Sequence, residues 1–392
     1  MINKNQRKII MLILLLFSVS MMISSVYAAE KTLTPSKDIK TEIKKVPSGS
    51  VIKLDPSKGE FSISSSISIN KIVTIQSSNP SKNAIINLDK NLEKYGNAFN
   101  IANGGKLTLK NIIIKNGDSG LGGVIYNNGT VTLNRCTFTK NTAKYGGAIY
   151  NRGTITLTRC TFTKNTATSY GGAIYSDGTL TAKTCIFTEN TANYGGGATY
   201  NYNGRATLTD CIFTKNTATD YGGAINNGYA STLTAKTCIF TENTANYGGG
   251  AIYNENTLTA KTCTFTKNTA KNGDYLGAIY KMKGSKTTIT DCTFGPSKSA
   301  NLKLDKVTTS KPTTKNGKKI YTKVYNYKNF GKAIGSKTFT ITIDKKYKLL
   351  GKITKSAKVS SSYNSKTKKI TVAIKKLAYN KIAQVKFKII QI

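Results

Sequence analysis

A phrase that recurs every 24 to 29 residues constrains the fold of this chain more than any other feature. It occurs first at 122–145 as GGVIYNNGTVTLNRCTFTKNTAKY and returns from Gly146, Gly171, Gly195, Gly222 and Gly249, with a degenerate copy that ends at Gly295. One cysteine marks each copy, at Cys136, Cys160, Cys185, Cys211, Cys238, Cys263 and Cys292. A repeat of this length predicts a solenoid, in which each unit packs against its neighbours.

Within one repeat, the apolar residues alternate over short runs and never fall at helical spacing. Ile155 and Leu157 are two residues apart, and so are Cys160 and Phe162, with threonine at most positions between them. This alternation, bounded by glycine and asparagine, predicts half-buried strands. With a third strand at 148–150, we expect three short strands per triangular coil and, by stacking, a parallel β-helix with about 4.8 Å between coils.

In-register stacking places identical side chains above one another and so predicts ladders along the helix. One ladder is aromatic and comprises Phe138, Phe162, Phe187, Phe213, Phe240 and Phe265. Another is polar and comprises Asn141, Asn165, Asn190, Asn216, Asn243 and Asn268. Stacked asparagine side chains can hydrogen-bond along the axis and satisfy polar groups at the turns.

The paired signature GGA[I/V/T] and FxxN, as in GGAI at 146–149 and FTKN at 162–165, resembles the repeats of chlamydial polymorphic outer-membrane proteins. The fuller phrase GGAIYN-GTLTL-CTF-NTA looks most like the adhesin-like surface proteins of methanogenic archaea. The resemblance covers roughly 105–295. It implies a right-handed β-helix, a cell-surface location and an adhesive role.

The ends of the chain differ from the repeats. Lys4, Arg7 and Lys8 precede an apolar run and small residues, so we expect a signal peptide at 1–29, and Ile9–Ala29 as an uncleaved anchor is the alternative. The chain is therefore expected to be secreted or held at the cell surface. Residues 31–121 keep the strand rhythm without the cysteine and predict capping coils, so that the β-helix spans 30–300.

Beyond the repeats, a polar stretch carrying Pro312 predicts a linker at 301–319. Alternating runs at 320–392 predict a small antiparallel β-sandwich that is rich in lysine and resembles immunoglobulin-like modules. The predicted fold is therefore all-β, with a right-handed parallel β-helix followed by this sandwich.

The formal net charge is +40, and the chain contains no histidine. Residues 301–392 hold 24 lysines against two aspartates, a net charge of +22. This excess favours an anionic partner, such as an envelope or host polysaccharide or glycoprotein, although a basic surface that only keeps the chain soluble is the alternative. Because no nucleic-acid fold motif accompanies the charge, we expect no specific nucleic acid, and no membrane contact except through an uncleaved N-terminal segment.

The acidic residues of the repeats do not predict a catalytic site. Hydrolysis of a glycosidic bond needs two carboxylates across that bond, and calcium-assisted lyases need several converging on a metal. The acids are scattered, and those that share a phase lie two or more coils apart, which is already about 10 Å; they are Asp177, Glu189, Asp210, Asp220, Glu242, Glu255, Asp274 and Asp291. We therefore expect no catalytic residues, no cofactor and no metal, with a carbohydrate-active enzyme as the alternative.

The seven cysteines occupy one phase of one repeat, are odd in number and lack CxxC spacing. They predict a ladder of small buried thiols, and an occasional bridge between neighbouring coils stays open.

Two series of tyrosines give the candidate binding face. The first comprises Tyr126, Tyr150, Tyr175, Tyr200, Tyr253 and Tyr280, with Asn226 interrupting it. The second precedes the glycine pair and comprises Tyr145, Tyr170, Tyr194, Tyr221, Tyr247 and Tyr275. Aromatic rows can stack on sugar rings, and they can equally serve only to pack neighbouring coils. The function predicted from sequence is an adhesin-like β-helix rod that binds surface glycans or envelope polymers, with a purely structural envelope component as a further alternative.

Overall fold

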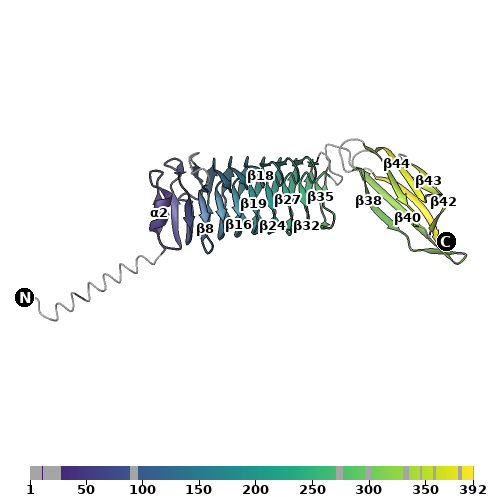
Figure 1. Ribbon diagram of the computed structural model, residues 1–392, viewed down its shortest axis with the longest axis horizontal. Helices are drawn as coiled ribbons and strands as arrows, with labels where there is room; N and C mark the ends of the chain where they lie inside the picture. The colour runs from purple at the N-terminus through teal and green to yellow at the C-terminus, as the bar shows by residue number, and fades with distance from the viewer. Residues whose placement is uncertain are drawn as a thin grey trace, which may run out of the picture.

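The computed structural model describes Met11 and residues 28–88, 96–270, 277–295, 302–329, 335–344, 347–355, 359–377 and 382–391. Between 28 and 295, the described chain winds into a parallel β-helix whose coils stack along one axis (Figure 1). The predicted signal peptide falls almost entirely outside the described residues. None of the described helices has the length and apolar character needed to cross a membrane.

The first sheet runs along the rod and holds eleven parallel strands within the described ranges. Its residues alternate between the core and the outer face. In one coil, Ile155 and Leu157 are buried and Thr156 between them is partly exposed. In order, the strands are β1 (Glu30–Leu33), β2 (Ser50–Leu54), β5 (Ile72–Ser77), β8 (Lys106–Lys110), β12 (Thr130–Asn134), β16 (Thr154–Thr158), β20 (Thr179–Lys183), β24 (Arg205–Thr209), β28 (Thr232–Lys236), β32 (Thr257–Lys261) and β36 (Lys286–Thr290).

The second sheet carries the phenylalanine row on its inner side. Its ten strands, counted over the described residues, are β3 (Phe61–Ile63), β6 (Ala84–Leu88), β9 (Ile112–Lys115), β13 (Thr137–Thr139), β17 (Thr161–Thr163), β21 (Ile186–Thr188), β25 (Ile212–Thr214), β29 (Ile239–Thr241), β33 (Thr264–Thr266) and β37 (Thr293–Phe294). The copies pair in register, so that Phe138 lies opposite Phe162.

The third sheet carries the first tyrosine series on its outer side. Its nine strands in the described part of the chain are β4 (Ile67–Ile69), β7 (Phe99–Ile101), β11 (Ile125–Asn127), β15 (Ile149–Asn151), β19 (Ile174–Ser176), β23 (Thr199–Asn201), β27 (Ile225–Asn227), β31 (Ile252–Asn254) and β35 (Ile279–Lys281). Tyr126 pairs with Tyr150, and Tyr150 pairs with Tyr175.

A fourth sheet was not predicted from the sequence. Its seven strands among the described residues are β10 (Asp118–Leu121), β14 (Thr142–Tyr145), β18 (Thr166–Tyr170), β22 (Thr191–Ala192), β26 (Thr217–Ala218), β30 (Thr244–Ala245) and β34 (Thr269–Ala270). The prediction of three strands per coil is therefore wrong for these coils. Its two-residue strands bury at most a single side chain, as β22 buries Ala192, so the run is too short for alternation to indicate a strand.

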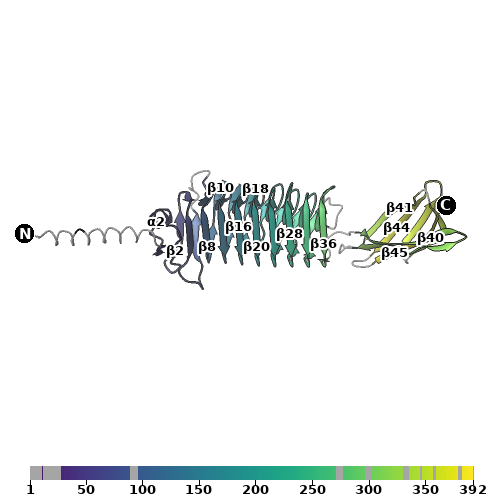
Figure 2. The same cartoon turned by 90° about the horizontal axis from the view of Figure 1, so that it is seen from below.

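The N-terminal end of the described rod is closed by β1 and a short helix, α2 (Ile39–Lys45), as Figure 2 also shows. The Asp38 side chain caps this helix by accepting hydrogen bonds from the backbone N–H groups of Lys40 and Thr41. Ile39 and Ile43 are buried in the core that continues into the coils. Capping coils were predicted here, and the helix itself was not.

The coils turn at residues with left-handed backbone geometry. Gly146 has a φ of +64°, and a Cβ at this position would collide with the carbonyl oxygen of Ile149. Two further corners of the same coil use residues other than glycine, since φ is +54° at Arg159 and +55° at Lys164. This geometry costs roughly 1 kcal/mol at each such residue, which the regular hydrogen bonding between stacked coils must outweigh.

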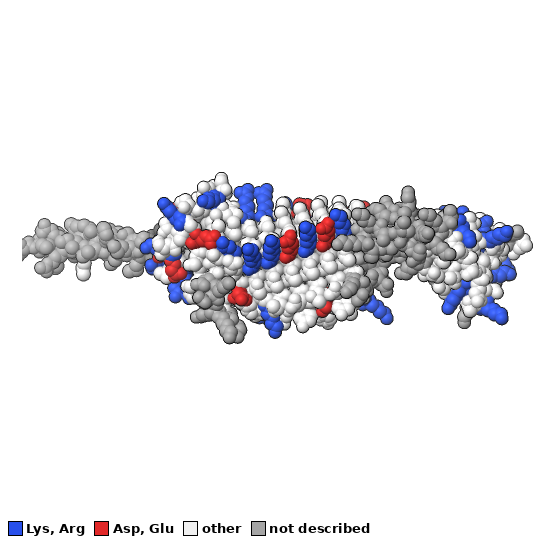
Figure 3. Space-filling model, turned by 90° about the horizontal axis from the view of Figure 1, so that it is seen from above, with Lys and Arg blue, Asp and Glu red and all other residues white. Residues whose placement is uncertain are grey.

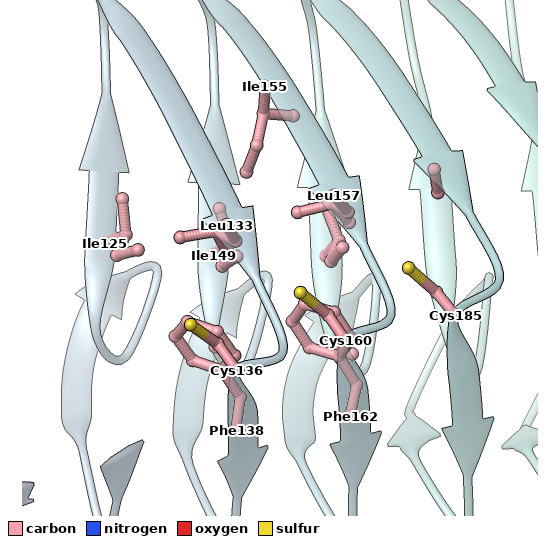
Figure 4. Close-up of a cluster of buried hydrophobic side chains, with 14 of the residues drawn as sticks. Ile125, Leu133, Cys136, Phe138, Ile149, Ile155, Leu157, Cys160, Phe162 and Cys185 are labelled. Atoms are coloured by element: carbon pink, nitrogen blue, oxygen red, sulfur yellow. The ribbon is translucent and has the colours of Figure 1, made fainter. Parts of the chain in front are cut away.

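The interior of the rod is a set of side-chain columns (Figure 4). Neighbouring rings of the phenylalanine row are stacked, with centroids 5.0 Å apart for Phe138 and Phe162 and an interplanar angle of 6°. The cysteines form a parallel column in which all seven thiols are free. Six are buried and Cys292 is partly exposed, so the structure contains no bridge between these coils.

The asparagine row is a continuous hydrogen-bonded ladder. The Nδ2 of Asn165 donates to the Oδ1 of Asn190 at 2.9 Å and to the carbonyl oxygen of Phe138 at 3.0 Å. Its own Oδ1 accepts from the backbone N–H and the Nδ2 of Asn141. The amide is therefore satisfied on both sides while fully buried.

A second buried polar row runs along the third sheet and was missed from the sequence. It comprises Asn127, Asn151, Ser176, Asn201, Asn227 and Asn254, which all lie at the inner corner after the tyrosine. Asn127 donates to Asn151 at 2.7 Å, and Asn151 donates to the Ser176 hydroxyl at 3.0 Å. The Oδ1 of Asn201, the next residue of this row, has no hydrogen-bond partner among the described residues.

The C-terminal unit consists of two antiparallel sheets in the described residues. One holds β38 (Leu302–Thr309), β40 (Lys318–Asn329), β45 (Ile382–Gln391) and β42 (Tyr347–Lys355), with β39 (Thr313–Lys315) paired to β40. The other holds β41 (Gly335–Thr342), β44 (Lys369–Leu377) and β43 (Val359–Asn364). Both sheets contribute to one core, for example through Phe387 and Val372.

The predicted linker at 301–319 is wrong over most of its length. Residues 302–309 form β38, which pairs with β40 from Leu302 opposite Asn329 to Thr309 opposite Lys323. A polar sequence is compatible with this strand, because the side chains of Val307, Thr308 and Thr309 are exposed. The C-terminal unit therefore begins at β38 rather than at 320.

Candidate ligand-binding groove

The tyrosines of the first series point outward because their neighbours point inward. In β11, Ile125 and Asn127 are buried, so alternation along the strand places Tyr126 on the outer face of the third sheet. The same argument holds for its copies. Asn226 takes the tyrosine position in β27, where it pairs with Tyr200 and Tyr253.

These rings stack on one another rather than standing free. Tyr126 and Tyr150 have centroids 5.4 Å apart with an interplanar angle of 2°, and Tyr150 and Tyr175 are 4.8 Å apart with an angle of 3°. The face of an inner ring is therefore occupied by its neighbours. A sugar can reach the edges and hydroxyl groups of this row, but it cannot lie flat on the inner rings.

The second series packs against the first with an offset of one coil. Tyr145 meets Tyr175 edge-on, with centroids 5.5 Å apart and an angle of 73°. Tyr170 lies 4.7 Å from Tyr200, and Tyr221 makes the equivalent contact with Tyr253 at 4.5 Å.

Tyr194 and Tyr247 fall out of this register. Gly195 and Gly248 stand in their place, as the bridges from Gly195 to Tyr170 and from Gly248 to Tyr221 show. Tyr275 lies outside the described residues.

Where the two series meet, they form an open groove of about 450 Å³. It is lined by Leu121, Tyr145, Tyr150, Tyr170, Tyr175, Tyr200 and Tyr202. Three residues of the first series, Tyr126, Tyr253 and Tyr280, belong to the row but do not line this groove. Tyr202 and Leu121 were not predicted, although Tyr202 stands beside the Asn203–Gly204 insertion that distinguishes its repeat.

A row of residues runs beside the groove, at the positions that follow the tyrosine strands by one residue. We call it the rim row, and Tyr202 is its member that lines the groove. Its members are Arg152, Asp177, Tyr202, Gly228 and Glu255, and the backbone N–H of each donates to the corner carbonyl of the preceding coil. Tyr202 is 41% exposed and is the most accessible ring of the groove. It lies between Asp177 in the preceding coil and Gly228 in the following one.

The electrostatic environment of the groove keeps the tyrosines protonated. Burial raises the pKa of Tyr150, Tyr170, Tyr175 and Tyr200 above the ordinary range, and Asp177 adds to the effect at Tyr175 while Glu255 does so at Tyr200. Burial also raises the pKa of the Glu255 carboxyl. At neutral pH the groove therefore offers phenolic hydroxyl groups that can both donate and accept hydrogen bonds.

The acidic residues of the repeats do not form a metal site in the described part of the chain. No set of three or more histidine, cysteine, aspartate or glutamate residues could hold a metal ion in the part of the chain that the structure describes. Two of the scattered acids pair with lysines at another corner, Glu189 with Lys164 at 3.8 Å and Glu242 with Lys267 at 2.8 Å. Asp274 lies outside the described residues.

The cysteine column is closed to solvent, because six of its seven thiols are buried. The pKa shifts along it differ in direction, and hydrogen bonding to Cys238 lowers the pKa of Cys263 to about 7. Hydrogen bonding to the Cys160 thiol raises the pKa of Cys185 to about 12, so this buried thiol stays protonated at neutral pH.

Comparison with known protein families supports the fold. Residues 60–234 match the family model described as a right-handed β-helix region. Residues 237–255 match the chlamydial polymorphic membrane protein repeat. The right-handed β-helix and this type of repeat, both expected from the GGAI and FxxN signatures, are therefore confirmed. No curated protein matches the chain.

Among solved structures, the chain is similar to tailspike protein variants of the Escherichia coli bacteriophage HK620. One, in complex with a hexasaccharide, shares 9% identity over 92% of this chain and 86% of that chain, with a TM-score of 0.34. Another, in complex with a pentasaccharide, shares 10% identity over the same fractions, with a TM-score of 0.29. Likeness at this level carries no argument about the ligand or activity of this chain.

Proposed function

We propose that this protein is a secreted or cell-surface, adhesin-like protein whose β-helix binds a polysaccharide. The observation that carries the proposal is the tyrosine groove, which is open, about 450 Å³ in volume and lined by six phenolic rings. Sites for sugars combine flat apolar surface with a few well-placed hydrogen-bonding groups. The exposed ring of Tyr202 provides apolar surface, and the phenolic hydroxyl groups of the row provide hydrogen bonds at a spacing set by the coils.

The C-terminal unit supplies a different kind of contact. With 24 lysines and two aspartates between 301 and 392, it carries a net charge of +22. Long-range attraction of this kind is strong toward anionic polymers and is weakened by salt. We assign this unit to holding the rod on an anionic envelope surface and the groove to selective binding.

The proposal is tested by screening the full chain against immobilised wall polymers, mucin and polyuronates over a range of salt concentrations. Binding through the groove is expected to survive high salt for one class of glycan and to weaken about tenfold in Tyr202→Ala, which removes the most accessible ring. Tyr229→Ala is the matched control, because Tyr229 is 72% exposed and does not line the groove. Binding that salt abolishes for every polymer, or equal losses in both variants, would contradict the proposal.

The same experiment decides between binding and catalysis. Each bound glycan is recovered and its chain length is measured. We expect unchanged length, because the described residues that line the groove include no carboxylate. Shortened products would replace the adhesin proposal by a carbohydrate-active enzyme.

The role of the C-terminal unit is tested with a chain that ends at Gly295, since β38 already belongs to that unit. The truncated protein is expected to be released from the producing cell while it keeps its affinity for the glycan. Unchanged association with the cell would show that this unit does not hold the rod to the surface.

A further inference from the structure

The charge around the groove is opposite to that of the chain as a whole. The chain has 58 basic and 18 acidic residues, yet three carboxylates flank the tyrosines. Asp177 and Glu255 lie in the rim row, and Asp220 precedes Tyr221 on the other side, in the second tyrosine series. All three are partly exposed, and none forms an ion pair with another described residue.

The basic side chains nearest the groove lie at its N-terminal end and already contact tyrosines. The ammonium of Lys144 stands over the ring of Tyr145, 5.4 Å from its centroid. Interaction with the Tyr126 hydroxyl raises the pKa of the Arg152 guanidinium. A cation over the face of an aromatic ring is attracted by the ring electrons, and this attraction grows when the site is shielded from water. Tyr145, which lines the groove, thus already contacts an ammonium group, that of Lys144.

The lysines elsewhere on the rod do not cancel this local field. At one corner, opposite charges alternate along the coils, and Figure 3 shows such a row; its residues are Lys164, Glu189, Lys215, Glu242 and Lys267. Alternating charges cancel at a distance, and salt limits the reach of exposed charges to roughly 8 Å at physiological ionic strength. Beside Tyr202, the charged members of the rim row are Asp177 in the preceding coil and Glu255 two coils on, while Arg152 lies one coil before Asp177.

We propose that the groove selects a polysaccharide with free amino groups, and that an ammonium of this ligand lies against Tyr202 with Asp177 and Glu255 on either side along the rim row. This inference rests on the proposed glycan-binding function and names the class of sugar. Gly228 separates Tyr202 from Glu255 in the rim row, and the hydroxyl of Tyr200 lies where a side chain at this position would stand, so a further hydroxyl group faces the ligand there. The acetylated form of the same sugar lacks the charge and loses both the cation–π and the carboxylate contacts.

The test compares two hexasaccharides with one backbone, a β-1,4-linked glucosamine hexamer and its fully N-acetylated counterpart, titrated into the full chain at a pH that keeps the amines protonated. The amine form is expected to bind at least about tenfold more tightly. Glu255→Gln and Asp177→Asn are each expected to weaken binding of the amine form about fivefold and to leave binding of the acetylated form unchanged. The matched control is Glu189→Gln, which removes the same charge at a distant corner and is expected to have no effect.

A variant that is expected to gain affinity is also tested, because a gain cannot result from a loss of folding. Lys144→Met removes the internal ammonium from Tyr145 and is expected to raise the affinity for the amine hexamer about twofold. Equal binding of the two hexamers, or equal losses in Glu255→Gln and Glu189→Gln, would overturn the inference while leaving the proposed glycan-binding function standing. If neither hexamer binds and no glycan of the wider screen binds, the proposed function itself is overturned.

Discussion

The ring of Tyr170 lies over the ring of Tyr200, with centroids 4.7 Å apart and an interplanar angle of 34°. Tyr170 ends a strand of the fourth sheet, and Tyr200 stands in the next coil on the third sheet. Their contact joins two tyrosine rows into one surface and gives the groove its floor and wall. The proposed binding surface and the coil packing therefore use the same side chains. From the sequence alone, these two roles were alternatives.

The buried asparagine ladder is expected to be essential for stability. Asn190→Ala removes the donors to Phe162 and Asn216 and the acceptor for Asn165, so several buried polar groups lose their partners. Each such loss costs about 1–3 kcal/mol, and a fall in melting temperature with fast hydrogen exchange in the adjoining coils should follow. Asn193→Ala, at an exposed asparagine of the same coil, serves as the control. Similar melting temperatures for the two variants would contradict the assignment.

The second polar row contains a gap that one substitution should repair. Ser176 stands where its neighbours have asparagine, and the Oδ1 of the next residue, Asn201, lacks a partner among the described residues. Ser176→Asn would supply an Nδ2 donor at the right level and is expected to stabilise the rod by about 1 kcal/mol. Thermal unfolding of Ser176→Asn and Ser176→Ala measures the effect in both directions. A melting temperature for the asparagine variant at or below that of the parent would refute this account.

The close approach of successive coils depends on the second glycine of each pair. A Cβ at Gly147 would collide with the backbone carbonyl oxygen of Gly172 in the next coil. Gly147→Ala is therefore expected to destabilise the protein by more than about 2 kcal/mol, because backbone atoms must shift to make room. Gly120→Ala provides the comparison, since a Cβ there would meet nothing within 4 Å. Equal stability of the two alanine variants would show that the coils can separate without cost.

The buried tyrosines should make the fold sensitive to alkaline pH. Burial raises the pKa of Tyr253 to about 12, whereas a tyrosine in the unfolded chain ionises near pH 10. Between these values the unfolded state releases protons that the native state retains, so stability present below about pH 10 is lost as the pH rises toward 12. Thermal unfolding across this range, with tyrosinate absorbance as the reporter, should show the decline. Tyr253→Phe should flatten it, and an unchanged slope in that variant would exclude Tyr253 as a cause.

The repeat alone was enough to predict the stacked coils of a parallel β-helix, and the resemblance of its signatures to known repeats implied the right-handed turn. Features set by alternation of side chains were accessible from the sequence, because residues two apart share a face. The fourth sheet was missed, since a single inward alanine such as Ala143 leaves no alternation to detect. The left-handed geometry of the corners at Arg159 and Lys164 was not predicted, because it is unusual for such residues and becomes tolerable only within the stack.

The candidate site was predicted in part. The sequence placed Tyr150, Tyr175 and Tyr200 in one row, and three-dimensional stacking was needed to show that their ring faces are covered. The groove arises from the offset between two rows, which depends on how the chain turns at Gly171 between Tyr170 and Tyr175. Linear periodicity carries no information about that offset, so the role of Tyr202 at the rim could not be found.

The most direct test of glycan binding at the groove is residue-resolved tyrosine nitration of the full chain with and without the glycan that the screen selects. Tyr202, in the groove, is 41% exposed, and Tyr229, outside it, is 72% exposed, so both should react in the free protein. Bound glycan is predicted to protect Tyr202 and leave Tyr229 reactive. Protection of Tyr229 alone, or of neither residue at saturating glycan, would contradict the placement of the ligand in this groove.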